Sequence, residues 1–237
     1  MAKLIEPLVV VVPAAGVGKR MQSHRPKQYL SLHNSTILEH TVNRLLAHPS
    51  IDKVIIALSS SDEYYQDTSL MNHPKVQTVV GGVERVDSVL AGIQAIDAQQ
   101  YPWVLVHDAA RPCVPLKDIS TLITLCHESD QGGLLAAPVR DTMKRTDDKN
   151  NVLTTVDRSA LWHALTPQMF KVDELRTAIE TALHNGIDIT DESSAMEYAQ
   201  LPSQVVEGSS DNIKITRADD LTLAAFILTK QQEAVCE

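Results

Sequence analysis

The amino-acid sequence predicts an α/β fold: a Rossmann-like, mostly parallel β-sheet flanked by helices, with an inserted β-hairpin arm. Three observations predict it. Short apolar runs alternate with segments of helical period as far as Pro138. The runs lack alternating polar residues, which is typical of strands buried on both faces of a parallel sheet. Beyond Pro138, two strand-like segments flank a polar turn and interrupt this alternation.

The first half of the chain alternates expected strands with expected helices. The expected strands are Leu8–Val12, Lys53–Leu58, Val76–Val80, Trp103–His107 and Gly133–Pro138. The expected helices are Thr36–Ala47, Arg85–Ala98 and Leu116–Glu128. Apolar residues in these helices recur at intervals of three and four, so each helix can bury one face against the sheet.

The second half of the chain begins with the inserted hairpin. Val139–Thr146 and Val152–Arg158 have the pattern of strands, and the polar residues Asp147 to Asn151 form the turn between them. We expect residues 139–160 to project from the main sheet. A hairpin alone is marginal in water, so this arm favours dimerisation. The other reading is an edge strand that its charged residues guard against aggregation.

Helices and short strands complete the chain. The expected helices are Val172–Asn185, capped by Gly186, Asp191–Ala199, and Asp219–Gln232, which Thr216 and Asp219 open as a capping box. The expected strands are Gln204–Glu207 and Ile213–Thr216. We found no linker and no repeat, so residues 1–237 are expected to form one domain.

Composition excludes several classes of function. The net charge of −9, from 21 basic and 30 acidic residues, argues against a nucleic-acid partner, whose phosphates need many cations. The longest apolar run is too short to span a membrane, and the N-terminus does not resemble a signal peptide. Three cysteines without metal-binding spacing favour reduced thiols and a cytoplasmic location.

The loop after the first strand is the most informative segment. It contains the small residues Pro13, Ala14, Ala15, Gly16 and Gly18, followed by the cations Lys19, Arg20, Arg25 and Lys27. Ligands bind at the carboxyl ends of parallel strands, and small residues let backbone N–H groups approach a phosphate closely. Four cations within nine residues of an acidic chain favour phosphate binding over a tight turn with a solvated flank.

Two better-known phosphate-binding templates fail in this loop. The dinucleotide fingerprint requires a third glycine where Met21 stands, and the Walker A loop requires a hydroxyl residue where Arg20 stands. An NAD-dependent oxidoreductase therefore remains only a weaker alternative, since no acidic residue follows the second strand at the required distance. A nucleotide-binding regulator without enzymatic activity is a further alternative.

Two other strand ends are expected at the same edge of the sheet. Asp108 follows the fourth strand, where a carboxylate can hold Mg²⁺ or cap the next turn. His107 before it is expected to be structural. Gly81 and Gly82 follow the third strand and are either part of the site or a plain turn before a helix.

The ordered set of motifs resembles one family of nucleotidyltransferases. The motifs are Pro13-Ala14-Ala15-Gly-x-Gly-x-Arg, Pro26-Lys27-Gln28, Gly81-Gly82 with Arg85 and Ser88, His107 to Pro112, Asp141-Thr142, Asp157-Arg158, Thr166-Pro167-Gln168, Thr190-Asp191-Glu192 and Asp211 to Lys214. Together they are similar to the 2-C-methyl-D-erythritol 4-phosphate cytidylyltransferases of the non-mevalonate isoprenoid pathway. Val83 departs from the family, whose members often carry a polar residue at this position.

The resemblance implies a role for individual residues. It implies a catalytic role for Arg20, Lys27 and Lys214, and nucleotide binding by Pro13, Ala14, Ala15, Gly16, Gly18, Gly81, Gly82, Ser88 and Ala109. It implies binding of the acceptor by Arg111, Thr142, Arg158, Thr166, Thr190 and Asp211. Asp108 and Asp211 are the implied ligands of Mg²⁺ or another divalent cation. A turn near Asn212 is needed if Asp211 and Lys214 both face the site.

The resemblance also implies the reaction and the partners. CTP and 2-C-methyl-D-erythritol 4-phosphate would give 4-diphosphocytidyl-2-C-methyl-D-erythritol and pyrophosphate, and the arm would reach across a homodimer. The acceptor phosphate is already ionised, so positioning and electrostatic stabilisation can supply the catalysis. A ribitol 5-phosphate cytidylyltransferase would share most of these motifs and is the nearest alternative.

Overall fold

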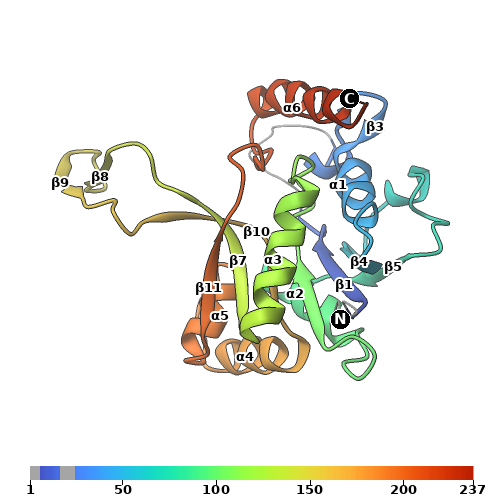
Figure 1. The fold of residues 1–237 in the computed structure, drawn as a ribbon, viewed down its shortest axis with the longest axis horizontal. Helices are drawn as coiled ribbons and strands as arrows, with labels where there is room; N and C mark the ends of the chain where they lie inside the picture. Colours follow the sequence, from blue (N-terminus) through green and yellow to red (C-terminus); the bar gives the residue numbers. More distant parts are fainter. Residues whose placement is uncertain (1–5, 17–24, 237) are drawn as a thin grey trace.

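A seven-stranded sheet forms the centre of the protein. The computed structural model describes residues 6–16 and 25–236 (Figure 1). The order of the strands across the sheet is β11 (Ser203–Glu207), β7 (Gly132–Pro138), β10 (Trp162–Lys171), β6 (Trp103–Val106), β1 (Leu8–Pro13), β4 (Ile51–Leu58) and β5 (Val76–Val80). All neighbours are parallel except β10, which runs antiparallel to β6 and β7. The expected mostly parallel sheet is confirmed.

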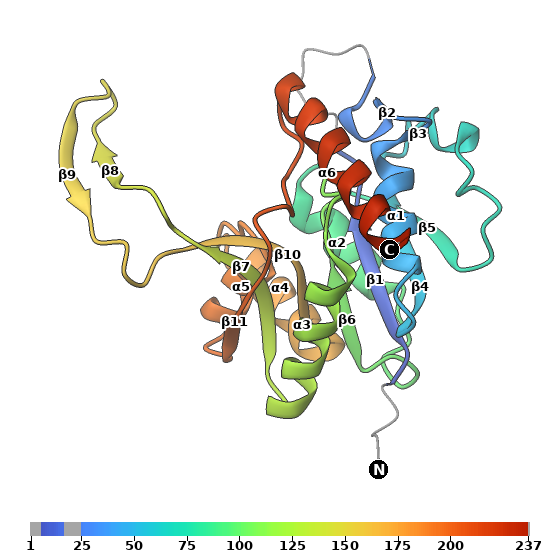
Figure 2. The same cartoon turned by 45° about the horizontal axis from the view of Figure 1, so that its top comes forward.

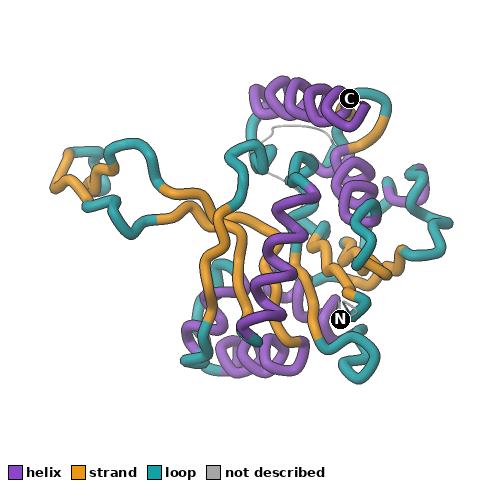
Figure 3. Tube along the Cα trace, in the orientation of Figure 1, coloured by secondary structure: helices purple, strands orange, loops and turns teal. Residues whose placement is uncertain are grey.

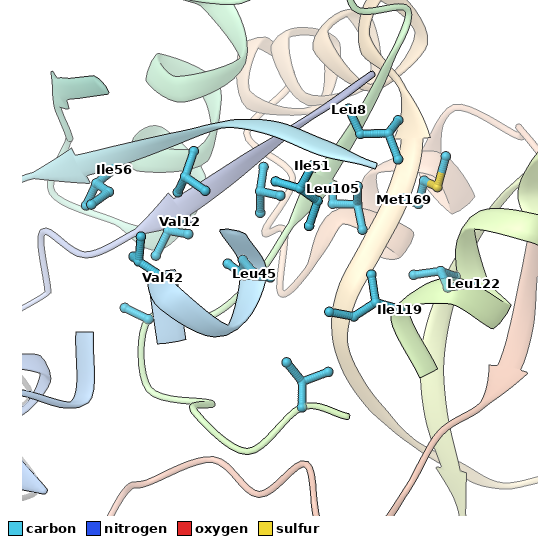
Figure 4. Packing of buried hydrophobic residues seen from close by; sticks show 14 of the residues in the cluster. Leu8, Val12, Val42, Leu45, Ile51, Ile56, Leu105, Ile119, Leu122 and Met169 are labelled. Carbon is cyan, nitrogen blue, oxygen red and sulfur yellow. The ribbon is translucent and has the colours of Figure 1, made fainter. Parts of the chain in front are cut away.

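Helices cover both faces of the sheet (Figure 3). Side chains of α1 (Ile37–Leu46) and α3 (Leu116–Ser129) belong to one buried cluster, which Figure 4 shows. Side chains of α2 (Arg85–Gln94), α4 (Val172–His184) and α5 (Glu192–Tyr198) belong to a second cluster. In β1, Val10 and Val12 face the first cluster while Val9 and Val11 face the second, so this apolar strand is buried on both sides.

A third cluster holds the last helix, α6 (Ala218–Cys236), against α1 and the segment that precedes α1. Ala224, Ile227 and Leu228 of α6 pack with Ile37 of α1 and Ala110 after β6. In Figure 1, α6 lies above α1 at the top of the view. This packing brings the segment that precedes α6, including Lys214, over the carboxyl ends of the central strands.

The sequence analysis did not predict strand β10. It contains Pro167, which has no backbone N–H to donate to a neighbouring strand and is therefore unusual in a central strand. The structure accommodates Pro167 at a shift in register: β10 pairs with β7 through Ala164 and again from Gln168 onward. The peptide bond between Thr166 and Pro167 is cis. The residues between the two paired stretches therefore leave the ladder at the point where β10 passes the end of β6.

Other sequence predictions need correction. Ile213–Thr216 is not a strand, since it runs beside Ala110 in a loop and the Ile215 N–H donates to the Ala110 carbonyl. The capping partner of Thr216 is Asp220 rather than Asp219, at 2.7 Å from the Thr216 nitrogen. Helix α2 ends at Gln94, four residues earlier than expected. The turn needed near Asn212 is present at Ser210 and Asp211, and Gly186 has the positive φ of a helix-ending residue.

The expected hairpin forms a separate two-stranded sheet. Strands β8 (Met143–Thr146) and β9 (Val152–Val156) pair only with each other among the described residues, and both are shorter than predicted. They lie apart from the seven-stranded sheet in both Figure 1 and Figure 2. A pairing between Pro138 and Trp162 marks where the chain leaves and rejoins the main sheet.

None of the helices within residues 6–16 and 25–236 has both the length and the apolar character that crossing a membrane requires.

The close contact between α2 and β1 predicts that a larger residue at Gly92 will lower the stability of the protein. A Cβ atom on Gly92 of α2 would collide with Cγ1 of Val11. Gly92→Ala is therefore expected to destabilise the protein by about 1–3 kcal/mol, despite the better helix propensity of alanine. Urea unfolding measures the change. Gln94→Ala, at an exposed position of the same helix, is the control and should change stability by less than about 0.5 kcal/mol.

Candidate active site

A pocket of about 270 Å³ opens at the carboxyl ends of β1, β5 and β6. The residues that follow these three strands line it, together with Lys27, Gln28 and Lys214 from elsewhere in the chain. The complete lining is Pro13, Ala14, Ala15, Gly16, Lys27, Gln28, Gly82, Val83, Glu84, Arg85, Ser88, Asp108, Ala109, Ala110 and Lys214. Strand ends that are far apart in the sequence thus meet at one edge of the sheet, as the sequence predicted.

Hydrogen bonds to the backbone fix the first wall of the pocket. The Ala14 N–H donates to the Ala57 carbonyl at 2.8 Å, which continues the pairing of β1 with β4. The buried side chain of Gln28 donates through Nε2 to the Ala14 carbonyl at 2.6 Å. Gln28 lies in the short 3-10 helix η2 (Lys27–Tyr29), so the same contact places Lys27 at the pocket.

Glycine is required in the second wall because the chain there passes close to α2. The Gly82 N–H donates to Ser88 Oγ at 3.2 Å. A Cβ on Gly81 would lie 2.7 Å from Ser88 Oγ, and one on Gly82 would collide with Asp87 Cβ. Ser88 itself is buried, so its hydroxyl supports the Gly82 turn at the base of the pocket. Val83, which departs from the family pattern, lines the mouth and is 93% exposed.

Three cations surround the carboxylate of Asp108, which is only 7% exposed. Arg85 Nε lies 3.0 Å from Oδ1, Lys214 Nζ lies 2.7 Å from Oδ2, and Arg111 Nε lies 3.4 Å from Oδ2. Burial alone would raise the pKa of Asp108, but the three cations hold it well below its ordinary value. Asp108 is therefore ionised at neutral pH. Arg85 also lines the pocket, although no role was predicted for it from the sequence. It follows Gly82 at the same edge of the sheet.

A buried chain of hydrogen bonds holds the backbone of Asp108. The Asp108 N–H donates to Thr166 Oγ1 at 3.1 Å, and Thr166 Oγ1 lies 3.0 Å from His107 Nδ1. His107 Nε2 lies 3.0 Å from the Arg111 carbonyl, so Nε2 carries the proton and Nδ1 accepts from the threonine hydroxyl. Burial lowers the pKa of His107 to about 4, which keeps the ring neutral. His107 is fully buried and is held between Thr166 and the Arg111 carbonyl, which is consistent with the structural role predicted for it.

The structure separates the remaining candidate residues. Arg111 and Thr166 are buried below the pocket, where Arg111 donates to the Asn212 carbonyl and Asn212 donates to the Thr166 carbonyl. Thr142, Arg158, Thr190 and Asp211 are exposed and do not line the pocket. Gly18 and Arg20 lie outside the described residues, and Gly81 adjoins the lining at Gly82.

The fit of the site to a divalent cation rests on Asp108. Residues 6–16 and 25–236 contain no group of three or more His, Cys, Asp or Glu side chains arranged to hold a metal. Mg²⁺ is commonly bound through one or two carboxylates together with substrate phosphates. Both oxygens of the Asp108 carboxylate contact cationic side chains, so an ion that arrives with a polyphosphate would bind there by replacing one of them. The exposed Asp211 shows no contact that makes it a second ligand.

The chain is similar to known proteins over nearly its whole length. The family model described as 2-C-methyl-D-erythritol 4-phosphate cytidylyltransferase matches residues 8–230. A protein of that name from Colwellia psychrerythraea is 58% identical over 94% of this chain and 95% of its own length. One from Vibrio parahaemolyticus is 53% identical over 98% of this chain and 100% of its own length. A solved structure of the Francisella tularensis protein is 36% identical, with a TM-score of 0.82 over 94% of this chain and 100% of that one.

The hydroxyl of Thr166 generates a testable prediction. Thr166→Val keeps the shape of the side chain but leaves the Asp108 N–H and His107 Nδ1 without their buried partner. We expect a loss of about 1–3 kcal/mol in the free energy of unfolding. Thr166→Ser keeps the hydroxyl and is the matched control. Equal stability of the valine and serine variants would contradict the hydrogen-bond chain.

Proposed function

Because the chain belongs to the 2-C-methyl-D-erythritol 4-phosphate cytidylyltransferase family, we propose that it joins CTP to 2-C-methyl-D-erythritol 4-phosphate. The products are 4-diphosphocytidyl-2-C-methyl-D-erythritol and pyrophosphate, as required of an enzyme of isoprenoid precursor biosynthesis. The observation that carries the proposal is the pocket itself, in which Lys27, Lys214 and Arg85 gather at the ends of three parallel strands of an acidic protein. The lining also contains the carboxylates of Glu84 and Asp108, so its three cations exceed its two anions by one, and this excess in a protein of net charge −9 suits a nucleoside triphosphate.

The reaction needs no nucleophilic side chain. An oxygen of the acceptor phosphate attacks the α-phosphorus of CTP in line, and a new P–O bond forms. The bond from the α-phosphorus to the oxygen that bridges it to the β-phosphate breaks, and pyrophosphate leaves with that electron pair. Because the attacking oxygen is already ionised, the protein contributes orientation and stabilisation of the charge that builds up at phosphorus.

Lysine side chains of the pocket supply this stabilisation in our proposal. Lys27 Nζ donates to the carbonyl of Ile215 at 3.2 Å, and Ile215 directly follows Lys214. This hydrogen bond, between residues 188 positions apart in the sequence, holds the Lys27 side chain beside the segment that carries Lys214. Arg20 is proposed as a third catalytic cation on the family pattern alone, since it lies outside the described residues.

The small residues of the pocket are proposed to bind the nucleotide. Pro13 to Gly16 present a surface without long side chains at the end of β1, as Gly82 does beyond β5 and Ala109 beyond β6. Backbone groups can therefore approach the base and the ribose closely. The hydrophobic side chain at Val83 leaves recognition of cytosine to backbone groups and to Ser88, which supports the Gly82 turn.

The proposed metal ion is Mg²⁺ held by Asp108. When bound, it would offset the negative charge of the triphosphate. Asp108 contributes an ionised carboxylate. Its backbone N–H donates to the Thr166 hydroxyl, which is itself hydrogen-bonded to His107. The role of Asp211 as a second ligand rests on the family pattern, as does that of Gly18 in the first loop.

The proposed assembly is a homodimer formed through the hairpin. Val152 and Leu153 of β9 are 61% and 62% exposed, and Trp162, where the chain rejoins the sheet, is 41% exposed. Val152 and Leu153 are successive residues of β9 and face opposite sides, so this two-stranded sheet exposes apolar side chains on both faces, which favours its burial against a partner. In this arrangement Thr142 and Arg158 of one subunit would serve the acceptor phosphate in the site of the other, with Arg111, Thr166, Thr190 and Asp211 as the remaining proposed acceptor residues.

A cytoplasmic location is proposed from the state of the thiols. Cys113 and Cys126 are buried and free of disulfides. Burial raises the pKa of each thiol to about 12, so both stay protonated and unreactive at neutral pH.

Release of pyrophosphate tests the proposed function directly. Purified protein is incubated with Mg²⁺, 2-C-methyl-D-erythritol 4-phosphate and either CTP, ATP, GTP or UTP. We expect release with CTP only. Faster release with ribitol 5-phosphate would assign the alternative acceptor, and no release with any polyol phosphate would overturn the proposal in favour of a nucleotide-binding regulator.

Substitution of Lys27 tests the catalytic assignment. Lys27→Ala is expected to lower kcat by about 100- to 1000-fold, because a preorganised donor to the reacting phosphorus centre is lost. Circular dichroism checks that the variant is folded. Lys230→Ala makes the same change on α6, outside the pocket lining, and should leave kcat unchanged. Normal turnover in folded Lys27→Ala protein would rule out the role of Lys27.

Mixing two variants tests whether the arm completes the site of a partner. Lys27→Ala and Arg158→Ala proteins are each expected to be nearly inactive at low acceptor concentration. If Arg158 acts across the dimer, one site of each mixed dimer carries both changes and the other carries neither. Random reassociation makes half of the dimers mixed, so about a quarter of wild-type activity should return. If Arg158 acts within its own subunit, mixing restores nothing.

A further inference from the structure

The carboxylate of Glu192 grips the Arg85 guanidinium on the side away from Asp108. Arg85 NH1 lies 2.6 Å from Glu192 Oε1, and Arg85 NH2 lies 3.2 Å from Oε2. Two parallel hydrogen bonds between the charged guanidinium and the charged carboxylate fix the orientation of the arginine as well as its position. Glu192 is 2% exposed and does not line the pocket, so it reaches any ligand there only through Arg85.

The backbone on both sides of Glu192 is anchored to the central sheet. Gln168 of β10 donates through Nε2 to Asp191 Oδ2 at 2.9 Å. The Ser193 N–H donates to Gln168 Oε1 at 2.8 Å. One buried side chain thus holds the residue before Glu192 and the residue after it, and α5 cannot shift along β10 without breaking both hydrogen bonds.

Arg85 links this anchored carboxylate to the pocket. Its Nε donates to Asp108 Oδ1 at 3.0 Å, so one guanidinium bridges two carboxylates from different elements. Burial alone would lower the pKa of Arg85, but Glu192 and Asp108 raise it above its ordinary value. The Asp108 carboxylate does not depend on Glu192 for its charge compensation, since Lys214 and Arg111 contact it directly.

We propose that Glu192 is a positioning residue of the nucleotide site, which fixes the Arg85 guanidinium in the pocket wall and through it the carboxylate of Asp108. This inference rests on the proposed function in one respect, because it takes CTP with Mg²⁺ to be the ligand of the pocket. The line of contacts from Gln168 through α5 to Arg85 makes the position of the pocket wall depend on β10, which contributes no lining residue.

Calorimetric titration of CTP in the presence of Mg²⁺ tests the inference without turnover. Glu192→Gln keeps the size of the side chain, and we expect it to weaken binding by about tenfold or more, the effect of losing a hydrogen bond to a charged group. The sign is informative. If Glu192 acted only as a distant negative charge, its neutralisation would strengthen the binding of an anion. Glu197→Gln, an exposed position on the same helix, is the matched control and should bind CTP as the wild type does.

A double-mutant cycle separates positioning from a merely structural role. We expect the Arg85→Gln, Glu192→Gln double variant to bind CTP no more weakly than Arg85→Gln alone, because Glu192 acts through Arg85. A lower melting temperature with unchanged CTP affinity in Glu192→Gln, tighter binding in that variant, or additive losses in the double variant would each overturn the inference. Should Glu192→Gln not fold, Glu192→Asp, which withdraws the carboxylate by one methylene, takes its place in the cycle. Wild-type protein that binds no CTP would instead count against the proposed function.

Discussion

The ionised carboxylate of Asp108 is the constraint on which the site depends. A buried charge is tolerated only when opposite charges and hydrogen bonds replace the water it has lost. Here Arg85 comes from α2, Arg111 follows β6, and Lys214 precedes α6. Each partner that is removed leaves the buried charge less fully compensated, so full compensation requires all three elements to come together. The pocket therefore forms only in the completed fold, although its lining is assembled from short loops.

Local pattern was sufficient to predict most of the fold. Apolar runs bounded by turn residues predicted the parallel strands, and helical periodicity predicted α1 to α4. Both predictions succeed because the spacing of apolar residues indicates which faces of an element are buried. Strand β10 was not predicted because proline is unsuited to the hydrogen-bond ladder of a sheet. The shift in register at Pro167 becomes visible only when β10 is paired with β7. The segment at Ile213 was misread because its apolar residues pack under α6 rather than within a sheet.

The site was predictable to the extent that strand ends define it. Asp108, Gly82 and the loop after β1 all follow apolar runs, so their meeting at one edge follows from parallel pairing. Arg85 was not assigned to the site, and the role of Glu192 was not anticipated. Both depend on which face of a helix turns toward the pocket, and on a contact between residues 107 positions apart. Thr166 illustrates the converse: its motif was recognised, but only the structure shows its hydroxyl bonded to His107 and Asp108.

The hairpin begins and ends at neighbouring points of the sheet. The Val139 N–H donates to the Leu161 carbonyl, and Pro138 pairs with Trp162, so the intervening residues form a closed excursion between adjacent strands. Because the entropy of closing a loop grows only slowly with its length, residues can be inserted or removed there with little effect on the sheet. The length of this excursion can thus change without disturbing the sheet or the pocket that its strand ends form. Within the excursion, the turn at residues 147–151 is the part that carries no proposed acceptor residue, since Thr142 precedes β8 and Arg158 follows β9, at the ends of these strands that lead back to the sheet.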